Sequence, residues 1–158
     1  MQNDFTQTST PTTFSQTAST PAGETAIVGN LGDGSGPGPE IMAASTLEGD
    51  DVVNGRNEKL GDIKEIMIDV ASGRVAYAVL AAGGFLGLGE KLFAIPWGAL
   101  TLDAERKCFI LDVEEERLKN APGFDKDHWP SMADPTWANE VHAYYGQRSY
   151  WQGGPTDL

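Results

Sequence analysis

An alternation of apolar and polar residues predicts a half-buried β-strand within residues 59–70. The two faces of this strand carry different side chains: Ile66, Ile68 and Val70 on one, and Glu65, Met67 and Asp69 on the other. Because successive side chains of a strand point to opposite faces, this period of two is typical of a strand with one buried face. Residues 71–73 then predict a tight turn, in which Asp69 accepts hydrogen bonds from the turn amides and Gly73 supplies a left-handed backbone.

The next stretch, residues 74–82, predicts a strand that is apolar on both faces. Its two faces are Val75, Tyr77 and Val79, and Ala76, Ala78 and Leu80. Since neither face is polar, we expect both to be covered. The small alanines on one face allow the close approach of another sheet, or suit a narrow barrel interior.

Further short strands are predicted by apolar runs, namely at residues 51–54, 91–95 and 108–113. The Asn54-Gly55 dipeptide suits a tight hairpin turn with positive φ. Pro96 predicts a bend over residues 96–100, because proline disfavours an interior position in a sheet ladder. A polar turn is predicted at residues 103–106.

Two short helices are predicted beyond residue 113. Residues 114–120 carry acids at the front and bases at the rear, which complements the helix dipole. Asp134 suits the N-cap and Pro135 the first helical position, so residues 136–145 are predicted to be helical. The tail is also rich in large aromatic residues: Phe124, Trp129, Trp137, Tyr144, Tyr145, Tyr150 and Trp151. Aromatic side chains bury about 150–250 Å² each, so we expect the tail to dock, either on its own barrel or on another subunit.

Composition divides the chain into three parts. Residues 1–43 are dominated by Thr, Ser, Pro, Gln and Gly, and offer too little apolar surface to offset an ordering entropy of about 1–2 kcal/mol per residue. We expect this segment to be disordered, as a solvated extension or a flexible tether. Residues 44–120 contain the predicted strands and form the domain. Residues 121–158 form a partly helical, aromatic-rich C-terminal extension.

The chain is strongly acidic. Its 158 residues include 11 Lys and Arg but 23 Asp and Glu, which gives a net charge of −12. Affinity for nucleic acids comes mainly from Lys and Arg that displace counterions, so this charge argues against a nucleic-acid partner and favours a basic or neutral protein. The first basic residue is Arg56, and no apolar run approaches the roughly 18 residues that span a bilayer. We therefore expect a cytoplasmic chain without a signal peptide or transmembrane segment.

A phosphate-binding loop is one interpretation of the glycine-rich run GGFLGLGEK at residues 83–91. Such a loop needs Lys directly after its last Gly, followed by Ser or Thr, whereas here Glu90 intervenes and Leu92 follows Lys91. No helix is predicted next whose N-terminus would face a phosphate. We interpret the run as a glycine-hinged hairpin loop. Three apolar side chains of this loop either fold onto the core or project as a contact patch: Phe85, Leu86 and Leu88.

No metal-binding or catalytic pattern is recognisable. His128 and His142 are far apart in sequence and lie outside any cluster with the spacing of metal ligands. The single Cys108 has no second cysteine to pair with and no His nearby to lower its pKa, so we expect a small buried hydrophobe. We expect no catalytic residues, no cofactor and no metal, and a protein that is not an enzyme.

Several segments together resemble the PRC-barrel domain: LGDI at 60–63, GRVAYAVL at 73–80, GGFLGLGEK at 83–91 and IPW at 95–97. This family is named after the cytoplasmic domain of the photosynthetic reaction centre H subunit. It also includes the C-terminal domain of the ribosome maturation factor and many free-standing bacterial proteins. The resemblance covers about residues 44–120 and implies a mainly β fold, a small antiparallel barrel that acts through binding and assembly. It implies no catalytic residues, because the family pattern consists mainly of structural Gly, Pro and apolar positions.

The predicted function is therefore a bacterial, non-enzymatic protein-binding or assembly adaptor built on a PRC-type barrel. Its expected partner is a protein, with a second copy of the chain among the candidates. The candidate contact residues are Phe85, Leu86, Leu88, Trp97, Trp129 and Trp137. Two alternatives stay open: an accessory in the assembly of a photosynthetic or other membrane electron-transfer complex, and a ribosome-associated assembly factor.

Overall fold

A computed structural model describes residues 22–29, 40–83 and 90–153 of the chain. Its strands are β1 (Ala26–Val28), β2 (Asp51–Val53), β3 (Lys59–Asp69), β4 (Arg74–Ala82), β5 (Lys91–Pro96), β6 (Leu100–Asp103) and β7 (Cys108–Leu111). Its helices are α1 (Ala44–Leu47), α2 (Glu115–Lys119) and α3 (Pro135–Tyr144), with short 3-10 turns η1 (Trp97–Ala99) and η2 (Tyr150–Gly153). The predicted mainly β fold is confirmed.

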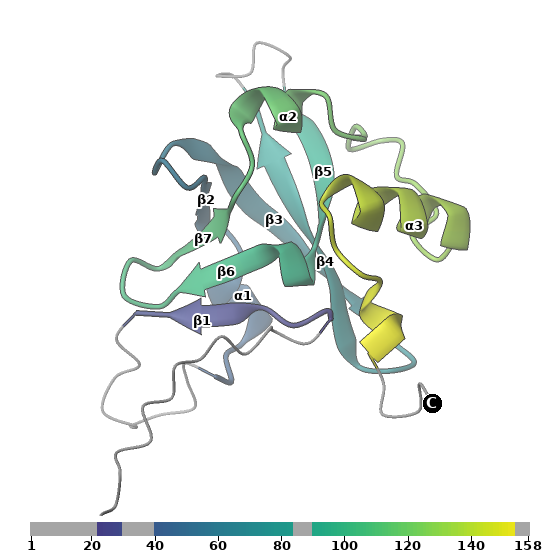
Figure 1. The fold of residues 1–158 in the computed structure, drawn as a ribbon, viewed down its shortest axis with the longest axis horizontal. Coiled ribbons are helices and arrows are strands. Elements are labelled where there is room, and N and C mark those ends of the chain that lie inside the picture. Colours follow the sequence, from purple (N-terminus) through teal and green to yellow (C-terminus); the bar gives the residue numbers. More distant parts are fainter. Residues whose placement is uncertain (1–21, 30–39, 84–89, 154–158) are drawn as a thin grey trace, which may run out of the picture.

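The strands form one sheet in the order β1-β6-β7-β2-β3-β4-β5. In Figure 1, β1 and β6 run across β3 and β4, because the sheet curls around its own core. The pairs β2–β3, β3–β4, β4–β5 and β6–β7 are antiparallel, whereas β1–β6 and β2–β7 are parallel. Among the pairings of the described residues, none joins the edge strands β1 and β5, so the curled sheet is not closed by hydrogen bonds between its two edges.

The interior of the curled sheet holds the main hydrophobic core. Every strand from β2 to β7 contributes buried side chains, and α1 and α2 each add one leucine. The largest members are Leu60, Ile63, Leu80, Phe93, Ile95, Leu100, Phe109, Leu111 and Leu118. Such alternate inward positions of short strands are what the apolar pattern predicts.

Two β-bulges decide which side chains of the β3–β4 hairpin face the core. Ile63 pairs with Leu80 and Glu65 with Val79, so β3 has one extra residue at this point. One extra residue reverses the alternation. Ile66 therefore packs against the same core as Ile63, although the two residues are three apart in sequence.

The second bulge lies in β4, where the strict alternation expected for residues 74–82 is wrong. Met67 pairs with Tyr77 and Ile68 with Val75, which leaves Ala76 as the extra residue. Ala76 and Tyr77 consequently both pack on the outer face, under the C-terminal extension. The bulge breaks the period of two that the sequence interpretation assumed.

Local turn signals largely predicted the loops. Asp69 Oδ1 accepts hydrogen bonds from the amides of Ala71 and Ser72 at 3.1 and 3.2 Å, and Gly73 has the expected positive φ of 75°. In the β2–β3 turn the positive φ belongs to Asn57, at 64°, and not to Gly55. There Asn54 stabilises the turn by accepting hydrogen bonds from the amides of Arg56 and Glu58.

Two strands lie where none was predicted. β1 falls within the segment expected to be disordered, and pairs in parallel with β6 while Ile27 packs against the core. β6 lies between the expected bend and the expected polar turn and shares only its two end residues with them; Leu100 and Leu102 are buried, and Thr101 and Asp103 are half-buried. Both strands are too short for their pattern to stand out. The rest of the predicted disordered segment, residues 1–21 and 30–39, lies outside the described residues.

The described part of the C-terminal extension docks on its own chain. The bridge between Phe124 and Leu92 of β5 consists of two backbone hydrogen bonds of 2.8 Å. Helix α3 follows, beside β5 in Figure 1, and begins as predicted: the Asp134 side chain accepts a hydrogen bond from the Thr136 amide, and Pro135 is the first helical residue. Trp137 packs edge-on against Tyr77 of β4, with 5.3 Å between ring centroids.

Candidate functional site

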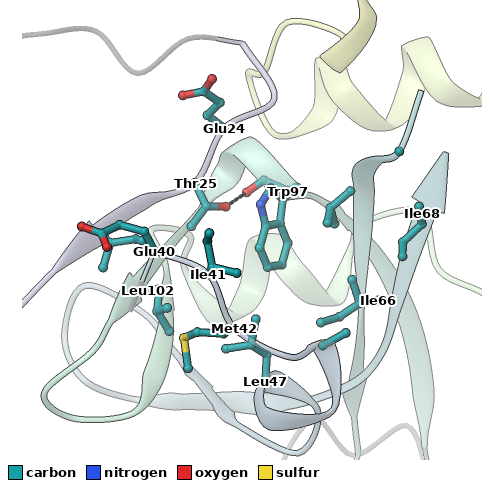
Figure 2. A pocket seen from close by; sticks show the side chains of 14 residues that line it. Glu24, Thr25, Glu40, Ile41, Met42, Leu47, Ile66, Ile68, Trp97 and Leu102 are labelled. Atoms are coloured by element: carbon teal, nitrogen blue, oxygen red, sulfur yellow. Dashed lines mark hydrogen bonds between the residues drawn. The ribbon is translucent and has the colours of Figure 1, made fainter. Parts of the chain in front are cut away.

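An aliphatic groove of about 630 Å³ opens at one end of the curled sheet (Figure 2). Most of the residues that line it are apolar: Ile27, Ile41, Met42, Ala44, Leu47, Ile66, Ile68, Val75, Trp97 and Leu102. The other lining residues are Glu24, Thr25, Glu40 and Gly73.

The walls of the groove come from β1, β3, β4, β6, α1 and η1, together with residues next to them. One side comes from β1, β6 and the residues that precede them, and the other from β3 and β4, whose Ile66 and Ile68 point into the groove in Figure 2. α1 and residues 40–42 lie between the two sides. The Thr25 hydroxyl donates a hydrogen bond of 2.5 Å to the carbonyl of Trp97, which ties the segment before β1 to η1.

The apolar side chains around the groove are unusually open to solvent. Ile41 is 73% exposed, Ile68 53% and Met42 37%. Val70, directly beyond β3, is 91% exposed. Single exposed apolar residues are common on protein surfaces, but several of them around one concave site mark an interaction surface.

The ionisable groups of the groove are two carboxylates. Glu24 and Glu40 lie at its rim, and Figure 2 shows both carboxylates turned away from the apolar interior. Among the lining residues that the structure describes there is no Lys, Arg, His or Cys. The groove therefore joins an apolar floor to a negatively charged rim.

The predicted contact residues lie in different surroundings. Trp97 lines the groove and also packs edge-on against Phe109, with 5.6 Å between centroids. Trp129 lies outside the groove and is 41% exposed, and its ring packs at a tilt against Phe124 with 5.0 Å between centroids. Trp137 is packed against the outer sheet face. The other three predicted contacts, Phe85, Leu86 and Leu88, lie outside the described residues.

The cysteine and the two histidines, which are the side chains most suited to catalysis or metal binding, lie in separate places. Cys108 is buried as predicted, and burial raises the pKa of its thiol. His128 donates from Nδ1 to Asp125 at 2.7 Å on the surface, and this hydrogen bond lowers the pKa of the Asp125 carboxyl. His142 is buried in the outer face cluster and donates from Nδ1 to the carbonyl of Ala138 at 2.7 Å. Within the described ranges, no three His, Cys, Asp or Glu side chains come together in a way that could hold a metal ion.

An acidic pair on β2 and β3 is engaged with a lysine. Lys59 Nζ lies 2.9 Å from carboxylate oxygens of both Asp51 and Asp62. Hydrogen bonding to Lys59 is the main cause that lowers the pKa of Asp51, and the two carboxyls together raise the pKa of Lys59. All three side chains are about half exposed, so this is a solvated ion cluster rather than a desolvated acid–base pair.

The family model of the PRC-barrel domain matches residues 39–118. This match spans half of the chain and includes α1 and every strand from β2 to β7. The chain belongs to the PRC-barrel domain family. The match contains most of the groove, including Ile41, Ile68 and Trp97, but not β1 or α3.

No curated protein matches the chain. The PRC-barrel match therefore supports the fold and does not by itself assign a specific role. None of the helices in the described part of the chain is long and apolar enough to cross a lipid bilayer.

Sequence interpretation missed most of the groove. Ile41 and Met42 fall in the segment expected to be disordered, and Leu102 lies between the expected bend and the expected polar turn, where no strand was predicted. The available signal was the Ile41-Met42 pair itself, an apolar dipeptide that only Glu40 separates from a run of Gly and Pro. Ile66 and Ile68 were predicted to share a strand face, but periodicity cannot tell whether such a face is covered by the chain or left open.

Proposed function

We propose that this PRC-barrel protein is a non-enzymatic protein-binding module, an adaptor or assembly component, and that the aliphatic groove is its interaction site. The observation that carries the proposal is the gathering of exposed aliphatic side chains around one concave site, above all Ile41 and Ile68. Removing apolar surface from water contributes about 25 cal/mol per Å². A partner that covers these side chains gains that free energy.

The lining of the groove supports binding rather than catalysis. Acid–base and nucleophilic catalysis both need a reactive group held close to an activating partner. The two ionisable groups of the lining, Glu24 and Glu40, are at the rim, and the floor is aliphatic apart from Trp97. We therefore assign no reaction to this site.

The charge of the chain supports a protein partner with basic residues. The rim carboxylates and the net charge of −12 attract a positively charged surface and speed its encounter with the groove. The same charge repels a second copy of the chain and the phosphate backbone of a nucleic acid. In a basic segment with aliphatic side chains, the aliphatic side chains complement the apolar floor and the basic side chains complement the carboxylates of the rim.

Affinity purification of the full-length protein, followed by mass spectrometry and binding measurements with the purified partner, tests the proposal. The double variant Ile41→Asp/Ile68→Asp places charges in the groove at positions that are already exposed, so we expect it to fold. We expect the dissociation constant for the partner to rise at least about tenfold, because each buried aliphatic side chain contributes about 1.5–3 kcal/mol.

The matched control is Trp129→Ser, which alters an exposed apolar residue outside the groove. We expect it to leave the affinity unchanged. Equal affinity of the wild type and the groove variant would contradict the proposed site. Turnover of a metabolite that the groove variant loses would contradict the non-enzymatic assignment. A membrane-complex subunit, a ribosomal protein or the chain itself as partner would decide among the adaptor roles.

A further inference from the structure

We propose that the partner segment binds as an added β-strand along the open edge of β3, and that it is a basic segment with alternating aliphatic side chains. This inference rests on the proposed function and specifies how the groove is used. Strand addition uses backbone hydrogen bonds for affinity and alternate side chains for specificity. It needs an open strand edge, apolar positions beside that edge, and complementary charge.

The edge of β3 is open over its second half. β2 pairs with β3 only over Lys59–Asp62, whereas β4 pairs with it from Asp62 to Asp69. At Ile63 the amide donates to Asp50 and the carbonyl accepts from Gly49, which ends the covered part. Beyond it, no strand among the described residues lies beside residues 64–69 on this side. At about 3.3 Å per residue, this edge is about 20 Å long.

The side chains next to this edge belong to the groove. The bulge in β3 turns Ile66 and Ile68 to the groove side, and Ile68 is half exposed there. A strand added beside β3 would place every second side chain on this same face, because paired residues of neighbouring strands share a face. Aliphatic residues at those positions would extend the apolar surface that Ile66 and Ile68 begin (Figure 2).

Charge along the edge favours a basic strand. Glu48 precedes Gly49 at one end and Glu65 lies within the edge. Asp69 ends the edge, and its carboxylate accepts hydrogen bonds from the turn amides and from the Tyr150 hydroxyl. The neighbouring cation Lys64 forms an ion pair of 3.2 Å with Glu90. Since opposite charges on paired strands stabilise a sheet and like charges destabilise it, Lys or Arg at the outward positions complements this edge.

Arg74 of β4 lies opposite Asp69 in the register of the two strands. Its guanidinium donates a hydrogen bond to the carbonyl of Tyr150. It therefore points to the C-terminal extension and leaves the edge acidic. A second copy of the chain would present the same acids to this edge, which is why we commit to a basic partner and not to self-pairing.

Selection of a random library of 12-residue peptides on phage against the full-length protein gives the first test. We expect the selected peptides to alternate aliphatic residues with Lys or Arg, and to lose binding at least about tenfold on the Ile41→Asp/Ile68→Asp variant. Selected peptides with acidic residues or with aliphatic residues at helical spacing would overturn the proposal, as would the absence of any selected peptide.

Backbone methylation of the best synthetic peptide then tests strand addition itself. Two peptides are made, each with N-methyl groups at every second residue but offset from the other by one residue. One lacks the N–H donors that face β3, and the other lacks the N–H donors that face solvent. We expect one methylated peptide to bind at least about tenfold more weakly and the other to bind almost as well as the parent. On the protein side, we expect hydrogen exchange of alternate amides in residues 64–69 to slow when the parent peptide binds.

These outcomes separate the two proposals. A peptide that requires Ile41 and Ile68 but tolerates both methylation patterns would overturn strand addition and leave the groove as the binding site. Binding that persists in the groove variant would overturn the groove assignment, whichever methylation pattern it prefers.

Discussion

His142 is a buried titratable residue, with 2% of its surface exposed. It projects from α3 toward β4 and η2, where its ring lies 5.4 Å from the centroids of Tyr77 and Trp151 and 6.0 Å from that of Tyr150. Burial lowers its pKa, although the hydrogen bond to Ala138 opposes this effect. The ionisable groups that face the His142 ring among the described residues are the phenols of Tyr77 and Tyr150. Burial raises the pKa of Tyr77, and it raises the pKa of Tyr150 to about 12. Both phenols are therefore neutral near pH 7.

The lowered pKa of His142 predicts that acid destabilises the protein. Between the normal histidine pKa of about 6.5 and the lower pKa of the folded state, the unfolded chain binds a proton that the folded chain does not. The free energy of unfolding should therefore fall as pH falls below about 6.5, by at most about 1.4 kcal/mol per pH unit. Thermal unfolding between pH 7 and pH 5 measures this slope.

His142→Gln should remove this part of the pH dependence, whereas His128→Gln, at an exposed histidine, should retain it. An unchanged slope in His142→Gln would show that other groups cause it.

Among the secondary-structure elements, helix α3 is the one that packs the C-terminal extension against the sheet. Val141 and Trp137 pack with Ala76, Tyr77 and Ala94 on the outer face of β4 and β5. The small alanines let the helix approach the sheet closely. The bulge in β4 supplies this contact, because it places Ala76 and Tyr77 on the same face. The extension thus covers a sheet face that would otherwise be apolar and exposed.

This packing predicts different costs for two tryptophans of the extension. Trp137→Ala removes the ring that packs on Tyr77, and should lower the free energy of unfolding by about 2 kcal/mol or more. Trp129→Ala removes a ring that is 41% exposed, and should cost less than about 1 kcal/mol. Urea denaturation of both variants measures the difference, and equal losses would contradict the docked arrangement.

Net charge acts at the scale of the whole molecule. With 23 acidic and 11 basic side chains, the chain has a negative field that reaches beyond any one contact. The described ion pairs lie on the surface, with side chains exposed in most cases, so each contributes little to stability. The field therefore acts mainly on the choice of partner.

The acidic field predicts no useful affinity for nucleic acids. Fluorescence anisotropy with labelled double-stranded DNA and single-stranded RNA at 150 mM salt should give no saturable binding up to about 100 μM, because non-specific binding depends on phosphate neutralisation by Lys and Arg. Saturable binding below about 10 μM would contradict this prediction and would reopen a ribosomal RNA contact.

Several features of the molecule could be predicted from local sequence. Asp69 and Gly73 shape their turn through short-range hydrogen bonds and a positive φ, and Asp134 with Pro135 starts α3 in the same way. Long apolar strands such as β4 were equally predictable, and the resemblance indicated the PRC-barrel family, which the match at residues 39–118 confirms. Each of these signals acts over a few residues, or extends along one long element.

Tertiary structure alone decided the rest. The short strands β1 and β6 pair with each other from distant parts of the chain, and their Ile27 and Leu102 pack against a shared core. The bulges of β3 and β4 depend on cross-strand register, which a single strand does not encode. Whether Ile68 is covered or open depends on which segments of the curled sheet reach it. The sequence determined the longer strands, most of the turns and the acidic charge, whereas the groove and its open edge arise only when elements distant in sequence meet.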